Sequence, residues 1–533
     1  MSLAKARRQN PRALAGSVLE HLLVEDLCET VELAGPGFIN FRIRPQAVAT
    51  ELTAALEGKH LFFRKTQQPR TVVIDFSSPN VAKPMHVGHI RSTILGDSLA
   101  RVLRLLGHHV ITDNHIGDWG TQFGKLLVGW KQQLNRDVLQ ADPLAELDRL
   151  YKTIHAASEA DPAVLDAARA ELVKLQEGDE ENLAAWRQMI ELSRHQFDAI
   201  YGRLGVTFDH TLGESFYNPR LKEIVRQLTE RGIAQPSEGA MVVFFEDDPA
   251  LKAHPALIQK SDGAANYATT DLATLEYRLQ TWHPGEIVYV TDSRQQLHFQ
   301  QLFATFRRWH PETDVRLAHV WFGTILGEDG KPFRTRSGEV IRLSDLLDEA
   351  EQRAFTLVTE KNPDMDEAQR RDIARVVGLG AIKYADLLPN RQSDYVFSWD
   401  KMLALNGNTA PYLQYAYARI RSIFRRYEAA GEPARPDDSP PRVHLDGPEE
   451  LQLAKQLLNF GLVLESVAEE YRPNYLCNYL YDLAGLYARF YEACPVLKAD
   501  EPTRSSRLAL CELVGRVIRQ GLDALGIETL EAM

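Results

Sequence analysis

The sequence contains little cysteine. Its 533 residues include four, which lack the paired spacing of a metal-ligand motif and are too few for a disulfide framework: Cys28, Cys477, Cys494 and Cys511. The histidines, His298 and His319 among them, are scattered without ligand-like spacing as well. We therefore expect a reducing compartment, with the cytoplasm as the default location, and we expect no structural zinc.

Long hydrophobic runs are also missing. No stretch approaches the ~18 consecutive apolar residues of a membrane span. The basic start MSLAKARRQNPR leads into no hydrophobic signal region. We therefore expect no membrane partner, and a mitochondrial presequence is the less favoured interpretation of the basic start.

An excess of positive charge is absent too. The chain has 61 Lys and Arg against 73 Asp and Glu, a formal net charge of -12. This balance argues against a protein coated with cations, although it does not exclude RNA. Any nucleic-acid partner must be held by local basic patches.

The composition that remains is that of a large globular protein. With 44% hydrophobic and 25% charged residues, a chain of this length is expected to form two to four domains. The run TVVIDF at 71–76 predicts a buried strand, apolar residues at helical spacing follow over 90–106, and HVITDN at 109–114 predicts the next strand. A strand, helix, strand unit favours a parallel sheet.

A second such unit lies far downstream. Strands are predicted at 285–293 and 317–326, with a helix at 296–309 between them. The two units are separated by an insertion that is helical over 130–201 and adds at least one strand in GAMVVFFED. Almost everything from 343 onward is predicted to be helical, interrupted by a loop rich in Pro and Asp at 429–450. Near the start, ETVELAGPGFINFRI suggests two strands around a Gly-Pro turn.

Two histidines flank a glycine where the first strand passes into the first helix, in SSPNVAKPMHVGHIRSTILGD. A helix N-terminus offers unpaired N–H groups and the positive end of a dipole, so it attracts phosphate. Gly88 would let a phosphate or a flat adenine approach the backbone, and His86 and His89 could donate hydrogen bonds to phosphoryl oxygens. The alternative is an ordinary turn with two surface histidines.

The wider context of this stretch resembles arginyl-tRNA synthetases, which are class I aminoacyl-tRNA synthetases, in their bacterial form. The resemblance extends from about residue 30 to the C-terminus and rests on several motifs in family order: the histidine stretch, NHIGDWGTQFGKL, GESFYNP, YATTDLA, YVTDSRQQLHF, GKPFRTRSGEV, KYADLLPNRQSDYVFSWDKMLALNGNTAPYLQYAYARIRSI and LYDLAGLYARFYEACPVL. It implies ATP-dependent activation of L-arginine and its transfer to the terminal ribose of tRNA(Arg).

The resemblance also implies an α/β fold with a particular domain organisation. A Rossmann-like parallel-sheet catalytic domain, split by an insertion, would be followed by an all-α anticodon-binding domain and preceded by a truncated α+β domain. The expected domains are a partial tRNA-elbow-recognition domain at 1–62, the catalytic domain at 63–345 with its insertion at about 131–262, a helical stem-contact region at 346–405, and the anticodon-binding domain at 406–533. The first half of the N-terminal domain is expected to be missing, because the sequence matches only its closing part. No editing domain is expected, since a site built for a guanidinium discriminates well.

Activation places charge on the α-phosphate of ATP, and cationic partners must stabilise it. The lysine-rich loop common in class I enzymes is here GKPFRTRSG. The resemblance implies that Lys83 compensates for that departure, with Lys331, Arg334 and Arg336 on the loop. Each could instead be a solvated surface cation. The positions implied for ATP binding are His86, Gly88, His89, Phe322, Gly323 and Thr324, and Mg²⁺ is expected to accompany the nucleotide.

A guanidinium is best bound by carboxylates, often with an aromatic ring. By motif match, Glu214 and Asp271 would hold it and Tyr267 would pack on it or hydrogen-bond to it. Tyr267 and Asp271 are i, i+4 neighbours, which predicts that they share one helical face. Both acids could instead be helix caps or exposed. The other positions that match arginine contacts are Ser78, Pro79, Asn80, His89 and Gln295.

RNA contact is expected where tyrosines alternate with arginines in YLQYAYARIRSIFRRY. The arginines are Arg419, Arg421, Arg425 and Arg426. They could instead form an ordinary solvated helix face, and the tyrosines could belong to the core. Two other functions share some features: a small nucleotidylyltransferase has the same histidine signature but lacks a helical C-terminal half, and a non-catalytic RNA-binding paralogue is disfavoured by the residues present. We expect a monomer.

Overall fold

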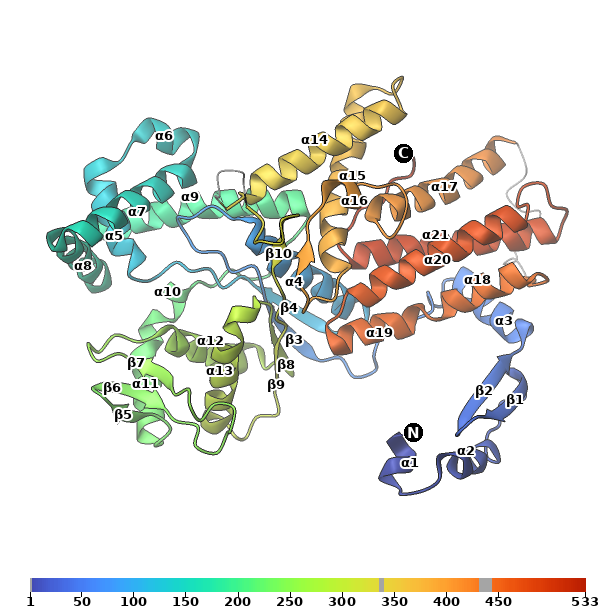
Figure 1. Cartoon of the computed structure of the whole chain (residues 1–533), viewed down its shortest axis with the longest axis horizontal. Coiled ribbons are helices and arrows are strands. Elements are labelled where there is room, and N and C mark those ends of the chain that lie inside the picture. Colours follow the sequence, from blue (N-terminus) through green and yellow to red (C-terminus); the bar gives the residue numbers. More distant parts are fainter. Residues whose placement is uncertain (1, 335–339, 431–442) are drawn as a thin grey trace.

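The structure, a computed structural model, describes residues 2–334, 340–430 and 443–533. At its centre lies a four-stranded parallel sheet with the order β4-β3-β8-β9. Figure 1 shows this sheet between the insertion, at the left, and the C-terminal helices, at the right. The strands are β3 (Thr71–Asp75), β4 (His109–Asp113), β8 (Glu286–Tyr289) and β9 (Arg316–His319).

The sheet joins the two units that the sequence placed more than 170 residues apart. Val73 of the central strand β3 lies opposite Ile111 of β4 on one side and Ile287 of β8 on the other. The interior of β3 is apolar because both faces of the sheet are covered by helices. Helix α4 (Val87–Leu105) connects β3 to β4, and α13 (Gln296–Trp309) connects β8 to β9. The predicted parallel-sheet fold is confirmed.

One predicted strand is wrong. The apolar run 317–326 does not form a single strand, because β9 ends at His319 and the chain then turns out of the sheet. The next strand, β10 (Ile325–Leu326), pairs in parallel with β11 (Tyr395–Val396), so it belongs to a different sheet. Between the two strands, the N–H of Phe322 donates to Thr291 O at 3.2 Å.

The insertion between β4 and β8 has a helical half and a mixed half. Its antiparallel sheet has the order β5-β6-β7, and the predicted strand in GAMVVFFED is β6. The predicted helical pattern over 130–201 is also confirmed. The elements are α5 (Gln122–Gln133), α6 (Arg136–Ala141), α7 (Pro143–Ala160), α8 (Pro162–Glu177), α9 (Glu180–Leu204), α10 (Glu214–Tyr217), η1 (Asn218–Arg220), α11 (Leu221–Glu230), β5 (Gln235–Ser237), β6 (Ala240–Val243), β7 (Ala256–Gln259) and α12 (Tyr267–Trp282). The short helix η2 (Ser293–Gln295) follows β8, outside the insertion.

From residue 343 onward, most of the described chain is helical, as the sequence predicted. These helices pack on one another and on α4, so one continuous core joins the sheet to the C-terminal helices. Of the loop predicted at 429–450, residues 431–442 lie outside the described residues, and α18 already begins at Pro448. The helices are α14 (Leu343–Lys361), α15 (Glu367–Leu387), α16 (Trp399–Met402), α17 (Ala410–Ala429), α18 (Pro448–Leu458), α19 (Phe460–Glu470), α20 (Asn474–Ala493) and α21 (Thr503–Ala524).

The N-terminal region lies at the lower right of Figure 1 and contacts the rest of the protein through α3 (Pro45–Leu56), which packs on α18 and α21. The predicted pair of strands is present as an antiparallel hairpin of β1 (Cys28–Ala34) and β2 (Phe38–Ile43). Helices α1 (Ser2–Ala6) and α2 (Pro11–Leu19) precede it. Phe38 and Phe41 on β2 are exposed.

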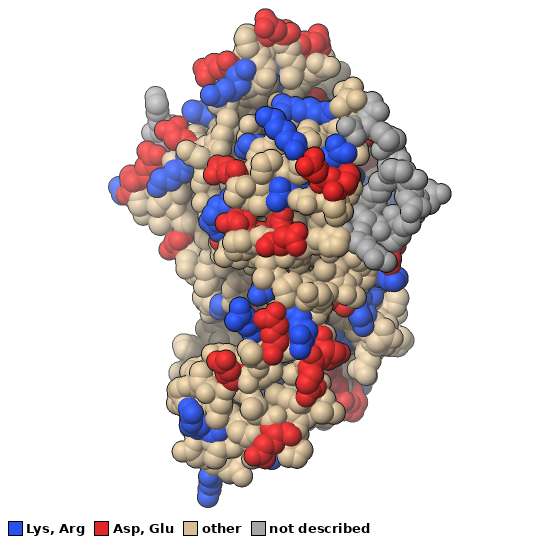
Figure 2. All heavy atoms as spheres, turned by 90° about the vertical axis from the view of Figure 1, so that its right-hand side faces the viewer, with Lys and Arg blue, Asp and Glu red and all other residues tan. Residues whose placement is uncertain are grey.

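The surface is mixed in charge. Figure 2 views the face formed by the N-terminal region and the C-terminal helices, and it shows acidic and basic side chains interspersed over that face. Among the described residues, no helix is long and apolar enough to cross a bilayer.

Candidate active site

The two histidines of the opening motif form the first turn of α4. His86 is the N-cap residue, and its Nδ1 accepts the N–H of Gly88 at 3.1 Å. The Nδ1 of His89 accepts the N–H of His86 at 3.0 Å, so each ring satisfies a backbone donor of the helix end. A Cβ at residue 88 would stand 2.9 Å from the His86 ring, which is a second reason for glycine there.

Both imidazoles are held in the neutral form. Burial lowers the pKa of His89 to about 3, and the neighbouring charge of His86 adds to that effect. Burial also lowers the pKa of His86, with contributions from the charges of Arg294 and Lys83. Since each Nδ1 accepts a hydrogen bond, the ring proton of the neutral form is on Nε2. The pair can therefore donate two N–H groups to a ligand without transferring a proton.

The carboxyl ends of β3 and β4 carry a buried ion triad. Arg278 of α12 donates from Nη2 to Asp75 Oδ2 at 2.6 Å and to Asp113 Oδ2 at 2.8 Å. Asp75 also accepts from the Oγ of Ser78 at 2.9 Å. Ser78 itself has a positive φ of 49°, a strained conformation that surrounding contacts must hold. The triad thus fixes α12 and the loop after β3 to the same edge of the sheet.

Helix α12 presents the first group of expected arginine-binding residues. Asp271 Oδ2 lies 2.6 Å from Nε2 of His298, which is on α13. Tyr267, one turn before Asp271, is 58% exposed and its ring centroid lies 4.9 Å from that of His298. Tyr267 and Asp271 therefore lie on the same side of α12, as predicted, and both contact His298. This histidine has no ligand-like spacing in the sequence.

Glu214 lies in an acidic environment at the start of α10. Burial raises its pKa to about 7; the charge of His115 opposes the shift, while Asp271 and Asp118 add to it. Asp118 is itself held by the N–H and hydroxyl of Ser215, at 2.8 and 2.7 Å. The charge of Asp271 acts on Glu214, so the two acids lie near each other in the expected arginine pocket, where a bound cation would favour the ionised form of Glu214.

The loop after β3 carries the remaining predicted arginine contacts except Gln295. Asn80 pairs with Gly117 across a parallel bridge, and the N–H of Gly117 donates to Pro79 O at 3.0 Å. A Cβ at 117 would stand 2.2 Å from Asn80 Oδ1, so only glycine admits this side chain. Gln295 is exposed at the N-cap of α13. These residues lie beyond the carboxyl ends of β3, β4 and β8, where ligands bind in parallel sheets.

After β9, the positions expected to contact ATP are held by hydrogen bonds from their own backbone N–H groups. The N–H of Gly323 donates to Arg391 O at 2.9 Å, and the N–H of Thr324 donates to Asp394 Oδ1 at 2.6 Å. Phe322 is buried, and the guanidinium of Arg91 lies over its ring at 5.6 Å.

The expected catalytic cations that the structure describes occupy two different settings. The ammonium of Lys83 lies 4.7 Å from the centroid of the Tyr151 ring, which belongs to the insertion helix α7. Lys331 and Arg334 are exposed on the loop after β10. Arg336 lies outside the described residues. Just after that gap, the N–H of Val87 donates to Ile341 O at 3.0 Å, which ties the end of the loop to the first turn of α4.

Comparison with known proteins identifies this arrangement. The family model "tRNA synthetases class I (R), catalytic domain" matches residues 51–399, which is most of the chain. The model "DALR anticodon binding domain" matches 413–533, and "Arginyl tRNA synthetase N terminal domain" matches 1–43. The chain belongs to the arginyl-tRNA synthetase family.

Two curated members of the family match the chain from end to end. The arginine–tRNA ligase of Proteus mirabilis is 46% identical and that of Cellvibrio japonicus 47% identical, each alignment covering 100% of this chain and 92% of the relative. Among solved structures, the arginyl-tRNA synthetase of Thermus thermophilus superposes with a TM-score of 0.84 at 27% identity, covering 100% of this chain and 93% of that one. The predicted family and fold class are thus confirmed.

The helix expected to meet RNA in the family is α17, and two of its arginines have partners within the chain. Arg421 Nε donates to Glu531 Oε2 at 2.8 Å, and Arg425 Nη1 donates to Glu531 O at 2.7 Å. Arg419 lies 4.7 Å over the Tyr491 ring, and Arg426 is exposed. The alternative that the tyrosines belong to the core holds for Tyr417, which is buried, and not for Tyr415, which is 48% exposed.

Three residues that the sequence analysis did not select contact or adjoin the predicted site residues. They are Asp118, Arg278 and His298, and none carries a motif of its own. Asp118 and His298 lie inside the quoted motifs NHIGDWG and DSRQQLHF, which was the available signal. Among the described residues, no group of three or more His, Cys, Asp or Glu could hold a metal ion.

Proposed function

We propose that this chain activates L-arginine with ATP and transfers the arginyl group to the 3'-terminal ribose of tRNA(Arg). The observation that carries the proposal is that hydrogen-bond donors for phosphate and acids for a guanidinium lie at the same edge of the parallel sheet. A pair of neutral histidines at the start of α4 offers donors to phosphate, and the coupled acids Glu214 and Asp271 offer counter-charge to a guanidinium.

The acids would orient arginine by its side chain. A guanidinium presents five donors in one plane, and two carboxylates match it better than they match an apolar or acidic side chain. His298 already donates to Asp271 at the position where the substrate would bind. Tyr267 is exposed beside this pair and would cover the guanidinium. Ser78 and Asn80, held by the loop after β3, would position the α-amino and carboxylate groups.

Activation would then proceed by displacement at the α-phosphate. An oxygen of the arginine carboxylate forms the new bond to phosphorus, the bond to the bridging oxygen breaks, and pyrophosphate leaves. Charge that develops on the phosphoryl oxygens would be stabilised by the Nε2–H groups of His86 and His89, with Lys83 and the cations of the loop at 331–336 on the leaving group. In the second step a ribose hydroxyl attacks the arginyl carbonyl and AMP leaves.

Mg²⁺ would enter with the nucleotide. Magnesium in such sites keeps several waters and binds through substrate phosphates with one or two carboxylates, rather than in a cage of protein ligands. The phosphate-facing part of the site is built from histidine, lysine and backbone N–H groups, which fits a metal carried by ATP.

Pyrophosphate exchange tests the proposal. Purified chain is assayed with each of the twenty amino acids, with and without tRNA(Arg). We expect exchange with arginine alone and, as the family resemblance implies, in the presence of tRNA. Robust exchange with another amino acid would contradict the assignment. A nucleotidylyltransferase would not require an amino acid, and a paralogue that only binds RNA would show no exchange.

A further inference from the structure

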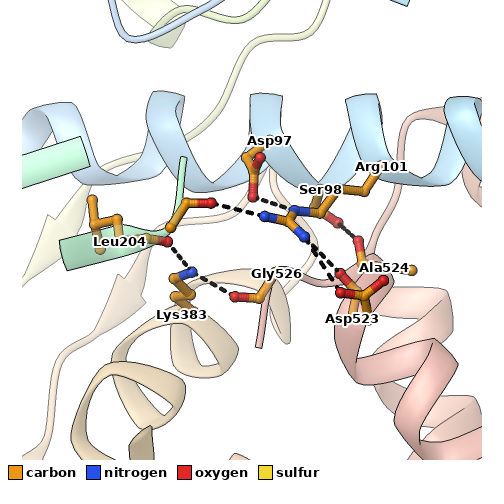
Figure 3. Close-up of polar contacts among 9 residues, drawn as sticks. Asp97, Ser98, Arg101, Leu204, Lys383, Asp523, Ala524 and Gly526 are labelled. Carbon is orange, nitrogen blue, oxygen red and sulfur yellow. Dashed lines mark hydrogen bonds and ion pairs between the residues drawn. The ribbon is translucent and has the colours of Figure 1, made fainter. Parts of the chain in front are cut away.

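The C-terminal half of α4 rests on a polar junction whose other members are distant from it in sequence. Figure 3 shows four segments meeting there: α4, the end of α9, α15, and the end of α21 with the turn that follows it. Ser98 Oγ donates to Ala524 O at 3.1 Å, and Arg101 Nη2 donates to Gly205 O at 2.8 Å. Arg101 also pairs with Asp97 at 2.7 Å on its own helix. Four parts of the chain, each more than 100 residues from the next, therefore meet at this junction, and α4 is one of them.

Lys383 of α15 lies at the centre of this junction. Its ammonium is buried and donates to Gly526 O at 2.5 Å and to Leu204 O, the last residue of α9. Burial lowers its pKa to about 8, and the charge of nearby Asp97 opposes that shift. The ammonium therefore joins two backbone segments through their carbonyls and also faces the carboxylate of Asp97 on α4, and a charge buried in this way must keep these partners. The position of the C-terminal turn is therefore strongly constrained.

The turn leaves little freedom of its own. Gly526 has a φ of +70°, and a Cβ there would stand 2.7 Å from Asp97 Oδ2 and 3.5 Å from the ammonium of Lys383. Only glycine adopts this conformation cheaply and leaves room for the carboxylate. The backbone of the C-terminal segment consequently lies directly against α4.

Nearer the site, a buried ion pair joins α4 to α15. Arg91 Nε lies 3.0 Å from Asp386 Oδ1, and its Nη1 donates to Gly323 O at 2.8 Å, among the residues expected to bind ATP. Asp386 and Lys383 lie on α15, one turn apart. Helix α4 begins at the two histidines, and eight residues separate His89 from Asp97, about 12 Å of helix. Helix α15 therefore contacts α4 directly through Asp386 beside the site, and at the junction its Lys383 binds the two backbone segments that lie against α4.

We propose that Lys383 is a positioning residue for the reaction: it holds the C-terminal turn and the end of α9 against α4, and so fixes the helix that presents His86 and His89. This inference rests on the proposed ligase function. A tightly packed helix moves as a unit. Loss of the junction should therefore displace the histidines, although Lys383 itself contacts no substrate. The effect should fall on the chemical step, because a displacement of about 1 Å at reacting groups can cost ~10² in rate.

The test compares Lys383→Met, which keeps the length of the side chain and removes its donors, with Lys383→Arg. Adjacent to Lys383 is a cavity of about 330 Å³, lined in part by Arg101 and Leu204, which gives room for a guanidinium. The matched control is Arg371→Met, on the exposed face of the same helix. Pyrophosphate exchange gives kcat and KM, filter binding gives the tRNA Kd, and amide hydrogen exchange reports on residues 97–106.

We expect Lys383→Met to lower kcat by about 10- to 100-fold with KM values and tRNA Kd within about twofold. In Lys383→Met, amide hydrogen exchange over residues 97–106 should be faster than in the parent. Lys383→Arg should restore most of the kcat and most of the protection from exchange. A kcat within twofold of the parent would overturn the inference. So would equal acceleration of exchange in all helices, since that indicates a general loss of stability.

A further variant keeps the inference testable if Lys383→Met does not fold. Gly526→Ala strains the same turn against Asp97 and should give the same fall in kcat, whereas an unchanged kcat overturns the inference. Failure of the parent to exchange with arginine would count against the proposed function alone. In that case hydrogen exchange over 97–106 still decides whether Lys383 or Gly526 fixes α4, and unchanged exchange contradicts it.

Discussion

The affinity for arginine should depend on pH through Glu214. Burial, with the charges of Asp271 and Asp118, raises the pKa of this acid to about 7, so it changes charge within the working range. The ionised form attracts the guanidinium and the protonated form does not. Because the pKa is raised, binding is fully present above 7 and is lost as pH falls through 7.

The size of the effect follows from the ionised fraction. With a pKa of 7, that fraction falls from about 0.9 at pH 8 to about 0.1 at pH 6. We therefore expect kcat/KM for arginine, which reports the free enzyme, to fall about tenfold between these values, the equivalent of ~1.4 kcal/mol. The assay is pyrophosphate exchange at constant ionic strength, with ATP and tRNA saturating.

Two variants assign the dependence to this carboxyl. Glu214→Gln should have a low kcat/KM that no longer varies in this window. Asp271→Asn removes a charge that raises the pKa of Glu214, so its midpoint should move to lower pH. A parent profile that is flat from pH 6 to 8, or a midpoint that persists in Glu214→Gln, would refute the electrostatic coupling described for the pocket.

Three further predictions address the phosphate donors, the counter-charge and the buried triad. His89→Ala should slow adenylate formation by ~10²–10³ by removing one preorganised donor, while tRNA Kd by filter binding stays unchanged; equal losses in both would point to a structural role. Asp271→Asn should raise the arginine KM by ~10–100-fold, since a charge-assisted partner is replaced by a neutral amide, and an unchanged KM would remove this residue from the pocket. Arg278→Met should lower the free energy of unfolding by about 3–5 kcal/mol, because Asp75 and Asp113 are left buried without their cation; urea denaturation measures this, and a loss under 1 kcal/mol would contradict the role given to the triad.

Much of the fold could be predicted because its signals are local. The strand at 71–76 is a run of buried apolar residues, and the helix after it has a clear period that ends at Gly107. The position of His86 at a helix start followed from the same two patterns. The error at 317–326 has the opposite cause, since the break after His319 depends on hydrogen bonds to Thr291 and Arg391, which are distant in sequence.

The supporting residues of the site could not be predicted for a similar reason. Arg278 occupies a helix position like any other, and only the fold shows that two strand-end carboxylates meet it. The same holds for Lys383, whose partners come from α9 and the C-terminal turn. For Arg421 and Arg425, sequence alone could not reveal the contacts with Glu531. Motifs therefore predicted which residues contact the ligands, and these assignments stay predictions, while the residues packed around them could be named only from the structure.

The most direct test of the central claim is the charging of tRNA itself. Purified chain is incubated with ATP, Mg²⁺, labelled arginine and tRNA(Arg), and the 3'-terminal nucleoside is isolated after nuclease digestion and identified by mass spectrometry. We expect arginyl-adenosine whose formation requires ATP and falls by orders of magnitude with His89→Ala. A terminal adenosine that carries another amino acid, or none while the protein is folded and binds tRNA, would contradict it.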